Sequence, residues 1–122
     1  MVKKILLVED DEMLREIYGS KLQSEGFELT AIDNGGDGLL AAKAQIFDLI
    51  LLDVILAQLD GFSILEDLKS KPETSGMPVV MLTNLGTHED RLKGEKLGAA
   101  DYLVKSNITP EQLIQSIAKY LA

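Results

Sequence analysis

The sequence contains no cysteine, and His88 is its single histidine. The missing thiols exclude disulfide bonds, cysteine nucleophiles and thiolate metal sites, and one histidine excludes a multi-histidine metal centre. No apolar run approaches the roughly 18 residues that a membrane-spanning helix needs. The first apolar run, residues 5–8, is also too short for the core of a secretory signal peptide, so we expect a cytoplasmic protein.

Positive charge is scarce as well. The chain has 12 lysines and arginines against 20 acidic residues, which gives a formal net charge of -8 at pH 7. Such a surface repels the phosphates of nucleic acids, and an acidic pocket on it attracts metal cations. The charge balance therefore argues against direct nucleic-acid binding by this chain and favours a cation site.

What the sequence does contain is a regular alternation of strand and helix patterns over one domain-sized length, so residues 1–122 are expected to form a single globular unit. Short apolar runs predict strands at 3–8, 27–32, 49–52, 78–82 and 99–104. Helices are predicted between them and after the last strand, and residues 71–76 are expected to be a loop. Five alternations joined by short connections predict an α/β fold with a parallel sheet and right-handed crossovers.

The predicted helices differ in how well their sequences define them. In the first helix Met13, Leu14, Ile17 and Leu22 recur at helical spacing, with Asp11 as a candidate N-cap. The helix after Thr87 carries few apolar residues and has Gly94 at its centre, so it should be weakly anchored. The last helix begins most clearly, because residues 109–112 (Thr-Pro-Glu-Gln) have the pattern of a capping box with proline at the first helical position.

Polar residues directly follow or end four of the predicted strands: Glu9 and Asp10, Asp53, Thr83, and Lys105. The carboxyl ends of parallel strands share one edge of a sheet, which is where ligands bind in open α/β folds. Two carboxylates about 4 Å apart repel by roughly 4 kcal/mol at an effective dielectric near 20, so a cluster of three calls for a cation, and all-oxygen ligands favour Mg²⁺ or Mn²⁺. Such a site suits phosphoryl transfer with Asp53 as the nucleophile.

Four motifs in the expected order give the chain a resemblance to the response-regulator receiver domains of two-component signalling, over essentially its whole length. They are ILLVEDD at 5–11, LLDV at 51–54 followed by Asp-Gly at 60–61, VMLTN at 80–84 and GAADYLVK at 98–105. The resemblance implies a doubly wound, flavodoxin-like (βα)5 fold whose five strands lie in the order 2-1-3-4-5.

The resemblance also assigns roles to the residues at the sheet edge. It implies phosphotransfer from a sensor histidine kinase or a phosphotransfer protein to Asp53. Glu9, Asp10, Asp53 and the backbone carbonyl of Ile55 would hold Mg²⁺ or Mn²⁺, and Lys105 would pair with the phosphoryl group. A receiver is not a turnover enzyme, although it catalyses its own aspartyl phosphorylation and dephosphorylation.

A second set of residues would pass the phosphorylation signal to a partner. The resemblance implies that the Thr83 hydroxyl is the switch and that the Tyr102 side chain responds to it. The switched surface would be formed by the helix after Thr87, the fifth strand and the last helix. This surface would meet a downstream protein or an effector domain.

The chain departs from the family pattern near the site. Receivers commonly have proline after the lysine, in a cis bond, and after the phosphoacceptor loop, where this chain has Ser106 and Ala57, so the loop geometry stays open. Ile55 and Leu85 stand where receivers often carry polar residues that assist an attacking water molecule. We therefore expect the phosphorylated state to be persistent.

Two other functions stay open at this point. The chain could be a degenerate receiver that acts as a phosphorylation-independent binding module. It could also be a turnover phosphatase with an aspartyl intermediate, similar to the haloacid dehalogenase-like hydrolases. Those enzymes place a second aspartate two residues after the nucleophile, where this chain has Ile55, and this difference disfavours the phosphatase.

Overall fold

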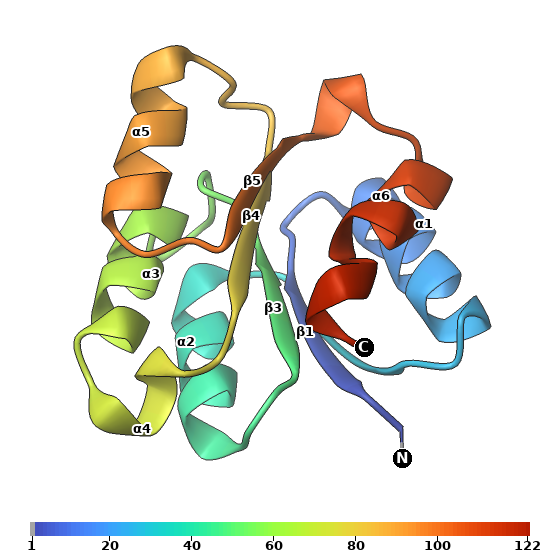
Figure 1. Cartoon of the computed structure of the whole chain (residues 1–122), viewed down its shortest axis with the longest axis horizontal. Helices are drawn as coiled ribbons and strands as arrows, with labels where there is room; N and C mark the ends of the chain where they lie inside the picture. The colour runs from blue at the N-terminus through green and yellow to red at the C-terminus, as the bar shows by residue number, and fades with distance from the viewer. Residues whose placement is uncertain (1) are drawn as a thin grey trace.

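The computed structural model describes residues 2–122, and its centre is a parallel sheet with helices on both faces (Figure 1). The strands are β1 (Lys4–Val8), β2 (Glu28–Ile32), β3 (Leu49–Leu52), β4 (Val79–Thr83) and β5 (Asp101–Val104). They lie in the order β2-β1-β3-β4-β5, and every neighbouring pair is parallel. The predicted α/β class and strand order are therefore confirmed.

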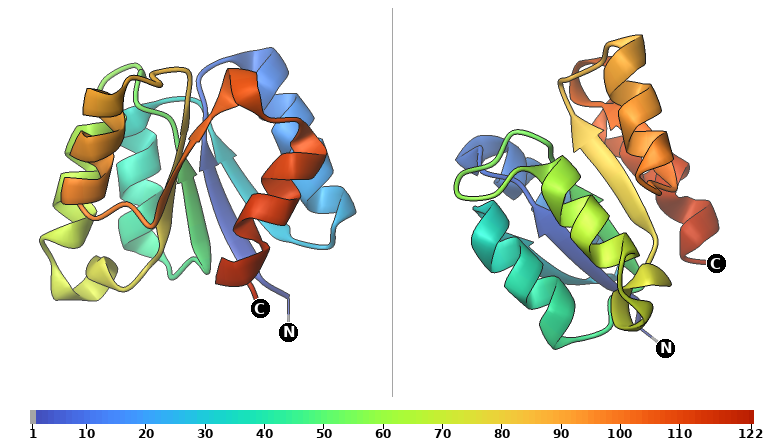
Figure 2. Two further views of the ribbon diagram at one scale, coloured as in Figure 1. Left: turned by 45° about the horizontal axis from the view of Figure 1, so that its top comes forward. Right: turned by 90° about the vertical axis from the view of Figure 1, so that its left-hand side faces the viewer.

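The helices form two layers. These elements are α1 (Glu12–Ser24), α2 (Gly35–Ala44), α3 (Gly61–Lys69), α4 (Pro72–Ser75), α5 (His88–Lys96) and α6 (Pro110–Ile117). Helices α1 and α6 cover one face of the sheet, while α2, α3 and α5 lie on the other face (Figures 1 and 2). Each face of the sheet is therefore shielded from water.

Strand β3 shows why its sequence has no polar face. Leu49 and Leu51 pack with the side chains of α1 and α6, and Ile50 and Leu52 pack on the opposite side with α2 and α3. All four side chains are buried. Alternate residues of a strand point to opposite faces, so a central strand covered on both sides must be apolar throughout.

Tertiary packing corrects two expectations about the helices. Residues 72–75 were predicted to be a loop but form the one-turn helix α4, which is held by Pro72 at its first position and by a hydrogen bond from the Thr74 hydroxyl to the Leu68 carbonyl. In α1, Leu22 is buried and Leu14 packs against the core as the predicted stripe requires, but Met13 and Ile17 are 71% and 42% exposed, because Tyr18 lies on the buried side of the helix.

Other local predictions are confirmed. Helix α6 begins at Pro110 with the complete Thr109–Gln112 capping box, and Asp11 caps α1 through the Leu14 amide. In α5 only Gly94 is buried, which agrees with a weakly anchored helix. Every peptide bond among residues 2–122 is trans, including the bond between Lys105 and Ser106. Across the described residues, no helix is both long and apolar enough to cross a membrane.

The loop from Asp53 to α3 contains one unfavourable backbone conformation. Gln58 has φ of 73°, in the left-handed region that costs a side-chain-bearing residue about 1 kcal/mol or more. The preceding carbonyl, of Ala57, accepts hydrogen bonds from the amides of Gly35 and Leu59. These bonds tie the loop to the start of α2 and hold Gln58 in this conformation.

We expect Gln58→Gly to raise the free energy of unfolding by about 0.5–1 kcal/mol, because glycine adopts this φ without a steric penalty. The matched control is Gln23→Gly on the exposed side of α1, which should lower it by about 0.5–1 kcal/mol. Urea unfolding of both variants measures the difference. Equal losses of stability in the two variants would show that the Gln58 backbone is not strained.

Candidate functional site

The candidate site lies at the carboxyl edge of the sheet, where the predicted residues come together. Glu9 and Asp10 follow β1, Asp53 follows β3, Thr83 ends β4, and Lys105 follows β5. The Asp53 amide donates to the Val8 carbonyl at 3.2 Å, which fixes the ends of β1 and β3 beside each other. One hollow of about 230 Å³ is lined by these five residues and by Ile55.

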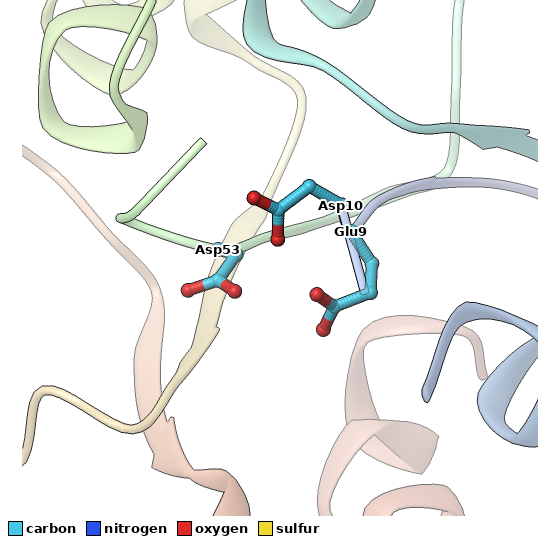
Figure 3. Close-up of side chains that lie close together, drawn as sticks. All are labelled: Glu9, Asp10 and Asp53. Carbon is cyan, nitrogen blue, oxygen red and sulfur yellow. The ribbon is translucent and has the colours of Figure 1, made fainter. Parts of the chain in front are cut away.

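Three carboxylates converge in this hollow. One oxygen from each of Glu9, Asp10 and Asp53 lies within 4.8 Å of the other two. Figure 3 shows the three side chains close together. Glu9 is 1% exposed and Asp53 6% exposed, whereas Asp10 faces solvent. At such separations each pair repels by roughly 1–4 kcal/mol, depending on how much water screens it. The cluster therefore favours a bound cation.

Lys105 is the one ammonium in the hollow, and it bridges two of the carboxylates. Its Nζ atom lies 2.6 Å from Asp53 Oδ2 and also contacts Glu9 Oε1. Burial is the largest influence on Lys105 and by itself lowers the pKa of the ammonium. The hydrogen bonds to Asp53 and Glu9 together outweigh it, so the pKa of Lys105 is raised and the side chain stays protonated. Burial also raises the pKa of Glu9, and the contact with Lys105 offsets this only in part. One ammonium does not balance the acids around it.

The donor atoms fit a small divalent cation. Glu9 Oε1 is buried with the Lys105 ammonium as its ion-pair partner, and the second oxygen, Oε2, accepts a hydrogen bond from the Asp11 amide at 3.1 Å. Carboxylate oxygens with free lone pairs beside an open hollow are the ligands that Mg²⁺ and Mn²⁺ prefer. Ile55, whose carbonyl the resemblance assigns to the metal, lines the same hollow.

The two candidate switch residues are joined through the backbone of Leu85. The buried Thr83 hydroxyl accepts a hydrogen bond from the Leu85 amide at 3.3 Å, and the Tyr102 hydroxyl donates to the Leu85 carbonyl. Tyr102 is 9% exposed and lies outside the site hollow. Burial, with a smaller effect from Asp90, raises the pKa of Tyr102 to about 12.

Two glycines shape the site, and sequence reasoning missed the role of one. A Cβ atom on Gly61 would lie 1.9 Å from the Asp53 carbonyl oxygen, so the Asp-Gly motif lets α3 start directly against the Asp53 backbone. A Cβ on Gly94 would lie 2.9 Å from Cδ2 of Tyr102, so this glycine makes room for the ring under α5. A glycine inside a helical pattern often has such a packing reason, and that signal was available.

Ser106 compensates for the missing proline in a way the sequence did not reveal. Its amide donates a hydrogen bond to Asn84 Oδ1 at 3.1 Å, which ties the loop after Lys105 to the loop after Thr83. Proline has no amide hydrogen to donate. Asn84 therefore helps to fix the loop after Lys105, one of the two loops whose geometry the sequence left open.

A parallel 2-1-3-4-5 sheet with an acidic cluster and a lysine at its carboxyl edge defines a receiver-type α/β domain. Comparison with known families agrees with this class. Residues 5–118 match the response regulator receiver domain, and the chain belongs to this family.

The chain is similar to parts of longer curated proteins. It is 43% identical over 102 residues to the transcriptional activator protein PfeR of Pseudomonas aeruginosa, which covers 84% of this chain and 32% of PfeR. It is 37% identical over 111 residues to the phosphate regulon transcriptional regulatory protein PhoB of Rhizobium meliloti, which covers 91% of this chain and 49% of PhoB. The chain thus spans about a third to a half of these relatives.

Solved structures show the same fold. A CheY-like receiver domain protein from Methanospirillum hungatei superimposes with a TM-score of 0.90 at 28% identity, covering 99% of this chain and 94% of that one. The receiver domain of the sensor histidine kinase PA1611 from Pseudomonas aeruginosa, with magnesium in its active-site cleft, gives 0.88 at 28% identity and covers 98% of both chains.

We expect Gly94→Ala to displace the Tyr102 ring, because the added methyl group would overlap it. The pKa of Tyr102 should then fall from about 12 toward the ordinary tyrosine value of about 10. Absorbance titration of tyrosinate measures this shift, with Tyr102→Phe used to assign the transition.

The matched control for this substitution is Gly19→Ala in α1, where the nearest side-chain atom to a new Cβ is Leu29 Cδ2 at 3.1 Å. It adds the same methyl group to a helix and should leave the Tyr102 transition unchanged. An unchanged Tyr102 transition in Gly94→Ala would mean that Gly94 does not control the position of the ring.

Proposed function

We propose that this chain is a phosphoacceptor switch in which Asp53 receives a phosphoryl group from a histidine of a sensor kinase or phosphotransfer protein. The observation that carries the proposal is the setting of Asp53, whose carboxylate lies beside those of Glu9 and Asp10 and 2.6 Å from the Lys105 ammonium. The family and the magnesium-containing neighbour support it. A cytoplasmic location stays a prediction.

In the proposed reaction a carboxylate oxygen of Asp53 attacks phosphorus while the bond from phosphorus to the donor histidine nitrogen breaks, and that nitrogen keeps the electron pair. Mg²⁺ or Mn²⁺, held by Glu9, Asp10, Asp53 and the Ile55 carbonyl, would supply positive charge for the phosphoryl oxygens. Lys105 would move its hydrogen bond from Asp53 to a phosphoryl oxygen. Later attack by water on the same phosphorus breaks its bond to the Asp53 oxygen, releases inorganic phosphate and restores the carboxylate.

The output would run from Thr83 through Leu85 to Tyr102. The Thr83 hydroxyl lines the site hollow and is free to bond a phosphoryl oxygen, and the Leu85 backbone joins it to Tyr102. Beside Tyr102 a hollow of about 440 Å³ opens between α5 and β5, lined also by Arg91 and Asp101. We propose that a downstream protein or effector domain reads this α5, β5 and α6 surface.

The two alternative functions explain fewer of the residues that gather at the site. A degenerate receiver would not need three carboxylates, a lysine and a hydroxyl around one hollow. A turnover phosphatase would need a second acid near Asp53, and Ile55 occupies the place where haloacid dehalogenase-like hydrolases carry it. Lack of phosphorylation would favour the degenerate receiver, and many turnovers on phosphate esters would favour the phosphatase.

We expect acetyl phosphate with Mg²⁺ to add one phosphoryl group to the wild-type chain and none to Asp53→Asn, as measured by intact mass. Asparagine keeps the size of the side chain but loses the nucleophilic carboxylate. Removal of the metal with a chelator should also stop the reaction.

The matched control is Asp48→Asn, at the opposite end of β3, which should be phosphorylated like the wild type. Full phosphorylation of Asp53→Asn would contradict the assignment of the nucleophile. An unreactive wild-type chain would favour the degenerate receiver.

We also predict a phosphorylated state that lasts minutes or longer. Ile55 is 62% exposed at the site, and neither it nor Leu85 offers a polar group to orient water. Ile55→Asn should shorten the half-life by roughly tenfold, the low end of general acid-base effects. Decay of the intact mass after removal of acetyl phosphate measures it, with Leu40→Asn on α2 as the control. A wild-type half-life of seconds would contradict the prediction.

A further inference from the structure

Arg15, on the second turn of α1, folds back onto the loop that carries two of the proposed metal ligands. Its Nη1 atom donates to the carbonyl oxygens of Glu9 at 3.0 Å and Asp10 at 3.4 Å. The side chain is half-buried there. One guanidinium thus bonds the backbone of both acidic residues.

The other bonds of this loop leave those two carbonyls to Arg15. The Glu9 amide donates to the Ile32 carbonyl at 3.0 Å, and the Asp11 amide donates to the Glu9 side chain. Asp11 itself caps α1 through the Leu14 amide. The Glu9 and Asp11 amides therefore have their own partners, and Arg15 is the side chain that bonds the two carbonyls.

The guanidinium binds these carbonyls although carboxylates stand close by. Asp33 and Asp37 line a hollow together with Arg15, yet among residues 2–122 Arg15 forms no ion pair. Charge pairing therefore does not explain where the side chain lies. Both bonds come from Nη1, whose two hydrogens are held in the guanidinium plane, whereas the ammonium of a lysine rotates on a flexible stem.

We infer that Arg15 is a positioning residue for the divalent-ion site, which holds the Glu9–Asp10 backbone so that both carboxylates face Asp53. This inference rests on the proposed function of the site. The inference predicts a change in metal affinity opposite to that of a simple charge effect. A nearby positive charge repels a cation, so removing that charge should by itself tighten metal binding. Loss of a positioning group should weaken metal binding instead.

The test measures Mn²⁺ binding to the unphosphorylated chain, by electron paramagnetic resonance of free Mn²⁺, for the wild type, Arg15→Met and Arg15→Lys. Arg15→Met should weaken binding about tenfold, in the range found for residues that orient metal ligands. Arg15→Lys keeps the charge and should recover only part of the affinity. Lys96→Met, on the exposed side of α5, changes the net charge equally and should alter affinity by less than about twofold.

The outcomes separate the possible roles. Unchanged or tighter Mn²⁺ binding in Arg15→Met overturns the inference, as does a loss of thermal stability without a loss of affinity. If Arg15→Met does not fold, Arg15→Lys decides alone, and wild-type affinity in that variant also overturns the inference. A wild-type chain that does not bind Mn²⁺ contradicts the proposed metal site itself, which is a different failure.

Discussion

The site depends on one buried interaction, the Lys105 ammonium shared between Asp53 and Glu9. These residues follow three strands, β5, β3 and β1, so the ion cluster joins the carboxyl ends of strands that are far apart in sequence. Buried charges are stable only when they are paired, and here two carboxylates compete for one ammonium. The sheet edge is therefore left short of positive charge, which favours the binding of a divalent cation.

The hydrophobic packing of the sheet makes this imbalance tolerable. Every residue of β3 and β4 is buried, and α-helices cover both faces. The apolar core holds the strand ends at fixed separations, so the carboxylates cannot move apart to relieve their repulsion. Gly61 completes the restraint, because its lack of a side chain lets α3 press against the Asp53 backbone. The apolar core stabilises the fold, so the fold tolerates the electrostatic repulsion among the carboxylates at the sheet edge.

Much of this arrangement could be predicted from the sequence. The apolar run before Asp53 and the alternation of elements define the parallel sheet, and parallel strands bring Glu9, Asp53 and Lys105 to one edge. What the sequence could not show depends on contacts between distant residues. Helical spacing does not say that Leu14 rather than Met13 faces the core, and a mid-helix glycine looks like a weakness until the Tyr102 ring is found beneath it. The Arg15 contact is invisible for the same reason.

The backbone and the side chain of Leu85 have different neighbours and therefore different possible roles. Its amide and carbonyl link Thr83 to Tyr102, and any residue other than proline offers the same two groups. Its side chain instead lines the hollow in which water would attack the phosphorylated aspartate. In the proposed switch the backbone would therefore carry the signal toward α5 and β5, while the side chain would set how long the signal lasts. Under that proposal, a change of side chain at this position would alter the lifetime of the phosphorylated state without breaking the link between Thr83 and Tyr102.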